Sequence, residues 1–489
     1  MKCSSTLLII ALTFFALPSS VKPQQDFEEW KQQQQQEFQQ FQDARDKEFM
    51  KYLQQEWEDF QTYQGLVRDE TPKPKNIPTA ETEPEITPEK PDAPKVSPPP
   101  TLEPAPSDLT PTAPQPPRTP EEPEKYQTIE FQFFGTPVQV KYDRQIGSPV
   151  EENIDQESIS GFWKSLGTAD TKSLIDHTEE YRKSLKLNDW GYAIFVHHLG
   201  ENLYENSPNS ATLFAWFMLL KSGYDVRVGY YEDTVYLLLP SENTLYSIPF
   251  LTIAGTKYYI MPLDGRSSHV KGITTYKEDY PGKSRPISFR LDASPAITEN
   301  RNTREFRFEY LGEQYTIEVP VNRNITEFYD TYPQADIPIY FQSAMSPHTA
   351  KSLVEELRPV IADETETRAV NLLLRFVQTA FKYQTDAQQF GKENYLFPEE
   401  TLYYPASDCE DRSALFAYLV RNLLGLEVIG LDYPGHIATA VKFSSDVGRD
   451  SITYDGQTYT ICDPTYIKAE YGMTMPVVQD KKVAVFTFD

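Results

Sequence analysis

The chain has 489 residues and a formal net charge of −26, with 46 Lys and Arg against 72 Asp and Glu. This acidity argues against nucleic-acid binding, which needs basic partners for the phosphates, and against a polybasic membrane-binding patch. The 39 prolines and the apolar content of only 39% indicate that part of the chain contributes to no hydrophobic core.

Residues 1–20 are typical of a signal peptide. Lys2 provides a positive start, and residues 7–17 form an apolar stretch that is too short to span a bilayer. The small residues Ser19 and Ser20 follow it and place the cleavage site nearby. We therefore expect an exported protein without a transmembrane segment in the mature chain, located in the periplasm, at the cell surface or outside the cell.

An eleven-residue aromatic repeat runs through residues 24–66. Its members are Phe27, Phe38, Phe49 and Phe60, each followed three residues later by Trp30, Phe41, Tyr52 and Tyr63. Eleven residues make three helical turns, so these side chains would form one stripe. Because such a stripe needs cover, we predict a Gln-rich helical stalk over 24–66 that self-associates through 24–64. Docking to another partner is the alternative.

Residues 69–125 differ sharply from their neighbours in composition. They hold 18 of the 39 prolines and no aromatic residue. Such a segment cannot bury a core, so we predict a disordered, largely polyproline linker that separates the stalk from the rest of the chain.

The remaining sequence is typical of two related α+β domains, over residues 127–290 and 303–489. Matching segments occur in the same order in both: 171–176 and 350–355, 201–204 and 380–383, 213–217 and 415–419, and 258–262 and 459–463. The offset is 179 residues in the first two pairs, 202 in the third and 201 in the fourth. The second copy therefore contains about 23 extra residues just before Cys409.

The segment that begins at Asp408 predicts a helix with Cys409 at its N-terminus. Its predicted buried face carries leucines four residues apart, at Leu415, Leu419 and Leu423. Gly425 is a natural C-terminal end for this helix. The helix dipole at this end favours an anion and can lower the pKa of a thiol. The acidic neighbours of Cys409 oppose that effect.

Three strands are predicted after this helix, at 426–432, 436–443 and 457–463. His436 opens the second strand, and Asp463 ends the third. In an exported protein, Cys409 and Cys462 could form a disulfide. Strand alternation, however, directs Cys462 away from the face that carries Asp463, which disfavours that pairing.

Acyl transfer by a thiol requires a nucleophile, a base that moves the proton and an acid that orients the base. Cys409, His436 and Asp463 provide these residue types in the order helix start, strand and strand.

Three motifs resemble the transglutaminase-like superfamily of papain-type cysteine enzymes. They are residues 408–416 (DCEDRSALF), 433–438 (YPGHIA) and 461–466 (ICDPTY). The similarity covers roughly residues 350–470. It implies a transglutaminase-like fold in which Cys409 is the nucleophile, His436 the base and Asp463 the residue that orients the imidazole.

The Asp-Cys-Glu motif also resembles the periplasmic bacterial transglutaminase-like cysteine proteases, in which acids beside the nucleophile bind calcium. This resemblance implies Asp408 and Glu410 as calcium ligands, a role that suits carboxylate oxygens. The alternative to a calcium site is an acidic helix start whose carboxylates are solvated. The acyl-transfer chemistry itself requires no cofactor. In the extra segment, Tyr403, Tyr404 and Asn394 are candidates for substrate contacts.

The first copy lacks the catalytic residue types. Cys409 aligns with Ser207 and Asp463 with Pro262, and no His occurs in residues 230–239. We therefore predict a degenerate transglutaminase-like domain that serves as a scaffold or as a binding domain. The other histidines are expected to be structural or surface residues: His177, His197, His198, His269 and His348.

The sequence thus predicts two tandem transglutaminase-like domains, the first degenerate, after a helical stalk and a Pro-rich linker. The expected function is that of an exported cysteine peptidase, which acts on peptide or protein amides through a thioester on Cys409. One alternative is a protein-cross-linking transamidase, in which a Lys amine resolves the thioester. Another is a non-catalytic adhesion or assembly protein of the cell envelope.

Overall fold

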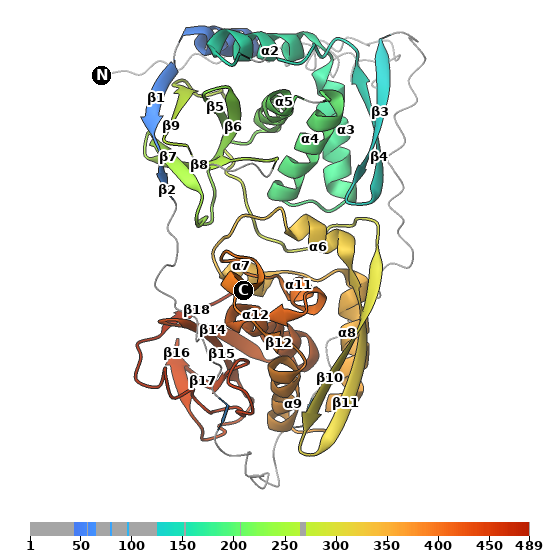
Figure 1. Cartoon of the computed structure of the whole chain (residues 1–489), viewed down its shortest axis with the longest axis vertical. Helices are drawn as coiled ribbons and strands as arrows, with labels where there is room; N and C mark the ends of the chain where they lie inside the picture. The colour runs from blue at the N-terminus through green and yellow to red at the C-terminus, as the bar shows by residue number, and fades with distance from the viewer. Residues whose placement is uncertain are drawn as a thin grey trace, which may run out of the picture. The chain divides into compact units, whose positions relative to one another are not determined.

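The computed structural model describes residues 44–55, 57–64, 79–80, 95–96, 125–150, 153–205, 207–264 and 270–488. The described part of the chain is a mixed helix-and-sheet protein (Figure 1). The chain divides into a unit that ends at Phe49 and a compact unit that begins at Met50. The site lies in the second unit.

In the first half of the globular region, a hairpin is followed by four helices and then by an antiparallel sheet. The hairpin and helices are β3 (Tyr126–Phe133), β4 (Thr136–Asp143), α2 (Gln156–Thr168), α3 (Thr171–Ser184), α4 (Asp189–Leu203) and α5 (Pro208–Lys221). The sheet strands are β5 (Arg227–Tyr231), β6 (Thr234–Leu239), β7 (Pro249–Ile253), β8 (Thr256–Met261) and β9 (Gly272–Tyr276).

The second half repeats this succession with additional short elements. Its hairpin and helical part comprises β10 (Arg301–Tyr310), β11 (Glu313–Asn322), α6 (Arg323–Tyr329), α7 (Pro338–Gln342), α8 (Pro347–Ile361), α9 (Glu366–Thr379), β12 (Lys382–Tyr383), α10 (Asp386–Gln389), α11 (Pro398–Tyr403), β13 (Ala406–Ser407), α12 (Cys409–Leu419) and the π-helix η1 (Val420–Leu424). The sheet comprises β14 (Glu427–Tyr433), β15 (His436–Lys442), β16 (Ser451–Tyr454), β17 (Gln457–Cys462) and β18 (Ala484–Phe486).

The two sheets have the same strand order. In the second half the order is β16-β17-β15-β14-β18, and the corresponding five strands of the first half run β7-β8-β6-β5-β9. The helices match as well, because α3 and α8 pack on the second strands of their hairpins and α4 and α9 on the first strands. The short elements between α9 and α12 are the extra segment of the second half.

Local sequence explains the ends of several elements. Asp455 and Gly456 both have positive φ angles, 46° and 72°, as a two-residue hairpin between β16 and β17 requires. Gly425 has a φ of 65° and follows η1, so the helix that starts at Cys409 ends where the glycine predicts. The predicted helix and the three predicted strands are therefore present, with bounds that differ by one or two residues.

The predicted stalk differs from the structure at its C-terminal end. Residues 44–55 are helical, but β1 (Trp57–Gln61) and β2 (Tyr63–Gln64) are strands. β1, drawn in blue in Figure 1, pairs with β9, and β2 pairs with β7. The prediction of a helix up to residue 66 is therefore wrong here, because edge strands of the sheet offer backbone hydrogen bonds to this segment. Residues 24–43 lie outside the described residues.

Two described pieces of the predicted linker contact the second half. Ala80 is buried, and its N–H donates a hydrogen bond of 2.9 Å to the carbonyl oxygen of Ile467. The Val96 N–H donates to the carbonyl oxygen of Glu364 at 3.2 Å. At these positions the linker is attached to the globular region rather than separated from it. The rest of the predicted linker lies outside the described residues.

The predicted signal peptide, residues 1–20, also lies outside the described residues. Within the described ranges, no helix combines the length and the apolar character needed to cross a membrane.

Candidate active site

Cys409 is the first residue of α12 and is fully buried. Its thiol donates a hydrogen bond to Glu410 Oε2 at 3.0 Å. α12 packs against β15. One helical turn after Cys409, the Ser413 hydroxyl donates to the carbonyl oxygen of Ile437 at 3.2 Å. This contact fixes the first turns of α12 against the start of β15, where His436 lies.

His436 and Asp463 form a buried pair, as the sequence predicts for a base and its orienting acid. His436 Nε2 and Asp463 Oδ2 are 2.7 Å apart, and the two residues are 2% and 1% exposed. The other oxygen, Asp463 Oδ1, accepts hydrogen bonds from the N–H groups of Thr465 and Tyr466 at 2.9 and 3.1 Å. His436 Nδ1 is buried and has no hydrogen-bond partner among the described residues.

The Tyr433 ring lies near the imidazole of His436 and nearly parallel to it. The two rings stack with centroids 6.4 Å apart and an interplanar angle of 23°. Burial, followed by the charge of Asp463, raises the pKa of Tyr433. The Tyr433 hydroxyl is therefore neutral at neutral pH, and its ring is an uncharged neighbour of His436.

Gln378, which no sequence motif singles out, connects the Asp463 loop to the Cys409 helix. Its Nε2 donates to the carbonyl oxygens of Asp463 and Ala469 at 3.1 and 3.0 Å. The main-chain carbonyl oxygen of Gln378 accepts a hydrogen bond from Arg412 Nη1 at 3.2 Å. Arg412 lies one turn after Cys409 and is fully buried, and burial lowers the pKa of its guanidinium to about 10.

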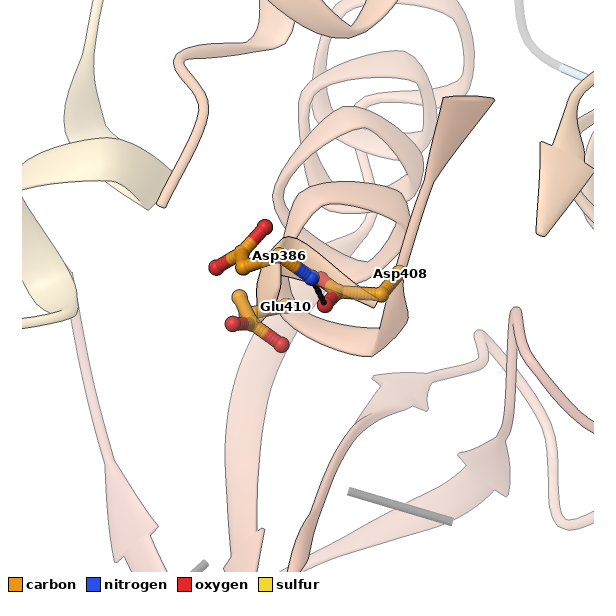
Figure 2. A group of neighbouring side chains, drawn as sticks. All are labelled: Asp386, Asp408 and Glu410. Carbon is orange, nitrogen blue, oxygen red and sulfur yellow. Dashed lines mark hydrogen bonds between the residues drawn. The ribbon is translucent and has the colours of Figure 1, made fainter. Parts of the chain in front are cut away.

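Three buried carboxylates gather at the start of α12: Asp386, Asp408 and Glu410 (Figure 2). One ligand oxygen of each lies within 4.8 Å of the others. The Asp386 N–H donates to Asp408 Oδ2 at 3.2 Å, as the dashed line in Figure 2 shows. Such a group of carboxylate oxygens fits a hard divalent cation. The sequence identified Asp408 and Glu410 but missed Asp386, which the extra segment brings in from 22 residues away.

The extra segment is fastened to α12 on the side of these acids. Asp386 Oδ2 accepts from the Asn394 N–H at 2.7 Å, and Asp411 Oδ1 accepts from the Leu396 N–H at 2.9 Å. Asn394, a predicted substrate contact, therefore touches the acidic group through its backbone.

Tyr403 and Tyr404, the other two predicted substrate contacts, are half-buried at the end of α11. Their carbonyl oxygens accept hydrogen bonds from Arg304 Nη1 at 2.9 and 2.6 Å. The Tyr404 hydroxyl donates to Asp330 Oδ1 at 3.1 Å. These contacts attach α11 to β10 and to the end of α6 through two main-chain carbonyls and the Tyr404 hydroxyl. The predicted role of both side chains in substrate contact stays a prediction.

Cys409 and Cys462 are not joined by a disulfide; both are buried thiols. Burial, with Asp463 as the second cause, raises the pKa of the Cys462 thiol far above its ordinary value. Cys462 is therefore protonated at neutral pH and a poor nucleophile.

The corresponding positions of the first half carry Ser207, Thr234 and Pro262. Ser207 is the N-cap residue of α5, and its hydroxyl lies 2.7 Å from the hydroxyl of Ser210. Thr234 opens β6 after a two-residue turn, as His436 opens β15. Pro262 follows Met261, which pairs with Leu237 as Cys462 pairs with Thr439. No base and no orienting acid stand at these places.

The remaining histidines in the described ranges are embedded in their own elements. His177 and His197 are buried, and the His198 ring stacks on Phe134 at 5.4 Å. Burial lowers the pKa of His198 to about 4. His348 lies on α8, and His269 falls outside the described residues.

Comparison of the chain with protein-family models, with curated proteins and with solved structures gave no match. We therefore infer the function from the residues and their geometry.

Proposed function

We propose that the protein is a thiol acyl-transfer enzyme of the transglutaminase-like type, acting as an exported cysteine peptidase on peptide or protein amides. The observation that carries this proposal is the buried pair of His436 Nε2 and Asp463 Oδ2 at 2.7 Å, with Nδ1 left for another partner. The helix that begins at Cys409 packs against the strand that begins at His436. A nucleophile, a base and an orienting acid thus lie on elements that contact one another.

The reaction would proceed in two steps. In the first, the Cys409 sulfur attacks the amide carbonyl carbon and its proton passes to His436 Nδ1. The carbon–nitrogen bond then breaks, and the imidazolium protonates the leaving amine, which leaves a thioester on Cys409. In the second step, His436 takes a proton from water as the water oxygen attacks the thioester, and the carboxylic acid leaves as the thiol is restored. Asp463 orients the imidazole throughout.

We further propose that Asp386, Asp408 and Glu410 bind calcium. One ligand oxygen from each of the three buried acids lies within 4.8 Å of the other two, beside the nucleophile. Their charge opposes formation of a thiolate. A bound cation would neutralise this charge. Since Glu410 also accepts the hydrogen bond of the Cys409 thiol, the proposed site and the nucleophile share a residue.

The two halves are proposed to be tandem copies of one domain, of which the first has lost activity. Support comes from the identical order of five strands in the two sheets and from the equivalent packing of the helices on the hairpins. Ser207, Thr234 and Pro262 at the equivalent positions cannot carry out the reaction described for the second half. The first half would then act as a scaffold.

An electrophilic peptide ketone that alkylates thiols tests the proposed enzyme. We expect rapid modification of the wild-type protein, located by peptide mapping at Cys409. His436→Ala should slow the modification by roughly 100-fold or more, because general base assistance is lost. His348→Ala serves as the matched control and should leave the rate unchanged. Equal rates in all three proteins, or modification at Cys462 instead, would contradict the proposal.

A further inference from the structure

The loop between β6 and β7 attaches the first half to the second. Leu245 pairs with Ala335 in an antiparallel bridge, and both residues are fully buried. The Thr244 N–H donates a hydrogen bond to Asp336 Oδ2 at 2.7 Å, and the Tyr246 hydroxyl donates to Asp336 Oδ1 at 3.0 Å. Both oxygens of one carboxylate are thus bound by the first half, which fixes the stretch around Ala335 in place.

Gln334, the residue before this bridge, is bonded in two directions. Its main-chain carbonyl oxygen accepts a hydrogen bond from the Tyr246 N–H of the first half at 2.8 Å. Its side-chain Oε1 accepts a hydrogen bond from the Tyr395 N–H of the extra segment at 3.1 Å. The side-chain Nε2 is buried and has no hydrogen-bond partner among the described residues, so Oε1 is the polar atom through which this side chain acts.

Tyr395 lies in the middle of three successive N–H groups that are each held by a different side chain. The pairs are Asn394 with Asp386 Oδ2 at 2.7 Å, Tyr395 with Gln334 Oε1 at 3.1 Å, and Leu396 with Asp411 Oδ1 at 2.9 Å. Because the three planar peptide units follow one another along the chain, the position of the middle one constrains the other two. Figure 2 shows the Asp386 carboxylate beside that of Glu410, which accepts the hydrogen bond of the Cys409 thiol. Gln334 is therefore linked through these amides to the acids at the start of α12.

Packing of aromatic rings supports the same connection. The Ala335 N–H donates to the Tyr340 hydroxyl at 3.2 Å, and the Tyr340 and Tyr395 rings meet edge to face with centroids 5.5 Å apart. Residues 391 and 392 are exposed, whereas residues 395–400 are buried, so the extra segment enters the core at Tyr395. The hydrogen bond to its N–H therefore fixes the chain at the point where the exposed loop ends.

We propose that Gln334 is a positioning residue of the active site, through which the first half holds the extra segment against the start of α12. The loop between β6 and β7 sets the position of Gln334, Gln334 sets that of the amides of residues 394–396, and these amides hold Asp386 and Asp411. The first half thus acts on the site of the second half although it carries no catalytic group. The catalytic consequence rests on the function proposed above, whereas the positioning of the amides does not.

Hydrogen exchange of the full chain, measured at single amides by fragmentation mass spectrometry, tests the positioning. Gln334→Met keeps the length of the side chain but removes the acceptor of the Tyr395 N–H. We expect the amides of residues 394–396 to exchange roughly tenfold faster or more, while those of β15 are unchanged. Asp336→Ala, which releases the loop of the first half and leaves the Gln334 side chain intact, should accelerate exchange of the same three amides.

Steady-state kinetics of the same variants test the effect on catalysis. Because Gln334 acts through the acids at the start of α12 rather than on the substrate, we expect kcat to fall by roughly tenfold while KM stays nearly constant. The matched controls are Gln314→Met and Asp446→Ala, since Gln314 on β11 and Asp446 after β15 are exposed. Both controls should leave the exchange of residues 394–396 and kcat unchanged.

Unchanged exchange of residues 394–396 in Gln334→Met, or faster exchange at Tyr395 alone, would overturn the positioning. Faster exchange of all three amides with unchanged kcat would overturn its role in catalysis. A wild-type protein that cleaves no peptide but shows the expected exchange in both variants would contradict the proposed function and still support the positioning.

Discussion

The chemistry of the proposed site depends on how two similar thiols are placed. Cys409 opens a helix beside His436, whereas Cys462 lies at the end of β17 and is held protonated by burial and by Asp463. Their roles therefore differ although both are buried.

We predict that Cys409→Ala abolishes activity with little loss of stability, whereas Cys462→Ala retains most of the turnover. The side chain of Cys462 packs without titrating, so its truncation should lower the free energy of unfolding by about 1 kcal/mol. Peptide hydrolysis and thermal unfolding of both variants check this. A 409–462 disulfide found by mass analysis of the active protein under non-reducing conditions would contradict it.

Gln378 is the residue most suited to hold Asp463 in position relative to the Cys409 helix. Gln378→Asn shortens the side chain by one methylene and should break its hydrogen bonds to the Asp463 loop. Because Gln378 acts through Asp463 rather than on the substrate, we expect kcat to fall by roughly tenfold or more while KM stays nearly constant.

The matched control for this change is Gln388→Asn, since Gln388 is exposed on α10. Steady-state kinetics of both variants decide the role of Gln378. A loss of stability with unchanged kcat would show that Gln378 is only a structural residue.

At the scale of elements, the segment before Cys409 is the main difference between the two halves. It carries Asp386 to the start of α12 and is tied there through the Asn394 and Leu396 amides. A cation at this group would bind α10 to α12 directly, so metal binding should be visible as stability as well as activity.

We predict that removal of calcium by a strong chelator lowers both the melting temperature and the activity, and that added calcium restores both. Asp386→Asn should weaken this response by roughly tenfold in the calcium concentration required. Asp446→Asn, an exposed aspartate in the loop after β15, is the control. Identical unfolding curves with chelator and with calcium would contradict calcium binding at Asp386, Asp408 and Glu410.

The N-terminal segment is a second element whose role changes the expected behaviour of truncated proteins. The Trp57 ring lies 5.5 Å from Tyr230 and 5.8 Å from Tyr276. On the opposite face of β1, Phe60 packs against the apolar cluster of the first sheet. A deletion of residues 24–125 should therefore destabilise the globular region, whereas the sequence alone predicts an independent stalk.

Single substitutions in β1 and β2 check this point without removing the segment. Trp57→Ala and Phe60→Ala should each lower the free energy of unfolding by about 2 kcal/mol, because half-buried aromatic contacts are lost. Tyr63→Ala is the control, since Tyr63 is 58% exposed. Chemical denaturation that gives the same stability for all three variants would contradict the attachment of β1.

The sequence predicted those features that depend on local patterns. The strand pattern placed His436 at the start of β15 and Asp463 directly after β17. The leucine spacing predicted the helix that begins at Cys409, and Gly425 marked the end of its continuation η1. The features that it missed are non-local: Asp386 joins Asp408 across the extra segment, and β1 joins β9 from more than 200 residues away. The aromatic repeat fits a continuous helix as far as Tyr63. The prediction was wrong for β1 and β2 because helical spacing alone cannot reveal an available sheet edge.

At the scale of the whole molecule, two halves with the same strand order carry one candidate site. Ser207 occupies the place of Cys409 but has no base, so Ser207→Ala should leave turnover unchanged. Self-association through residues 24–64 stays a prediction. Light scattering of the full chain tests it, because an oligomer would be detected directly. Its result does not alter the assignment of the site in the second half.

The central claim is that Cys409 forms a thioester with the acyl group of an amide substrate. The most direct measurement is mass spectrometry after incubation of the protein with a mixed peptide library and a Lys-like amine. We predict cleaved peptides from the wild type and from Ser207→Ala, and none from Cys409→Ala. Incorporation of the amine instead would keep the thioester and identify a transamidase. Neither product from the wild type, with and without calcium, would contradict the claim.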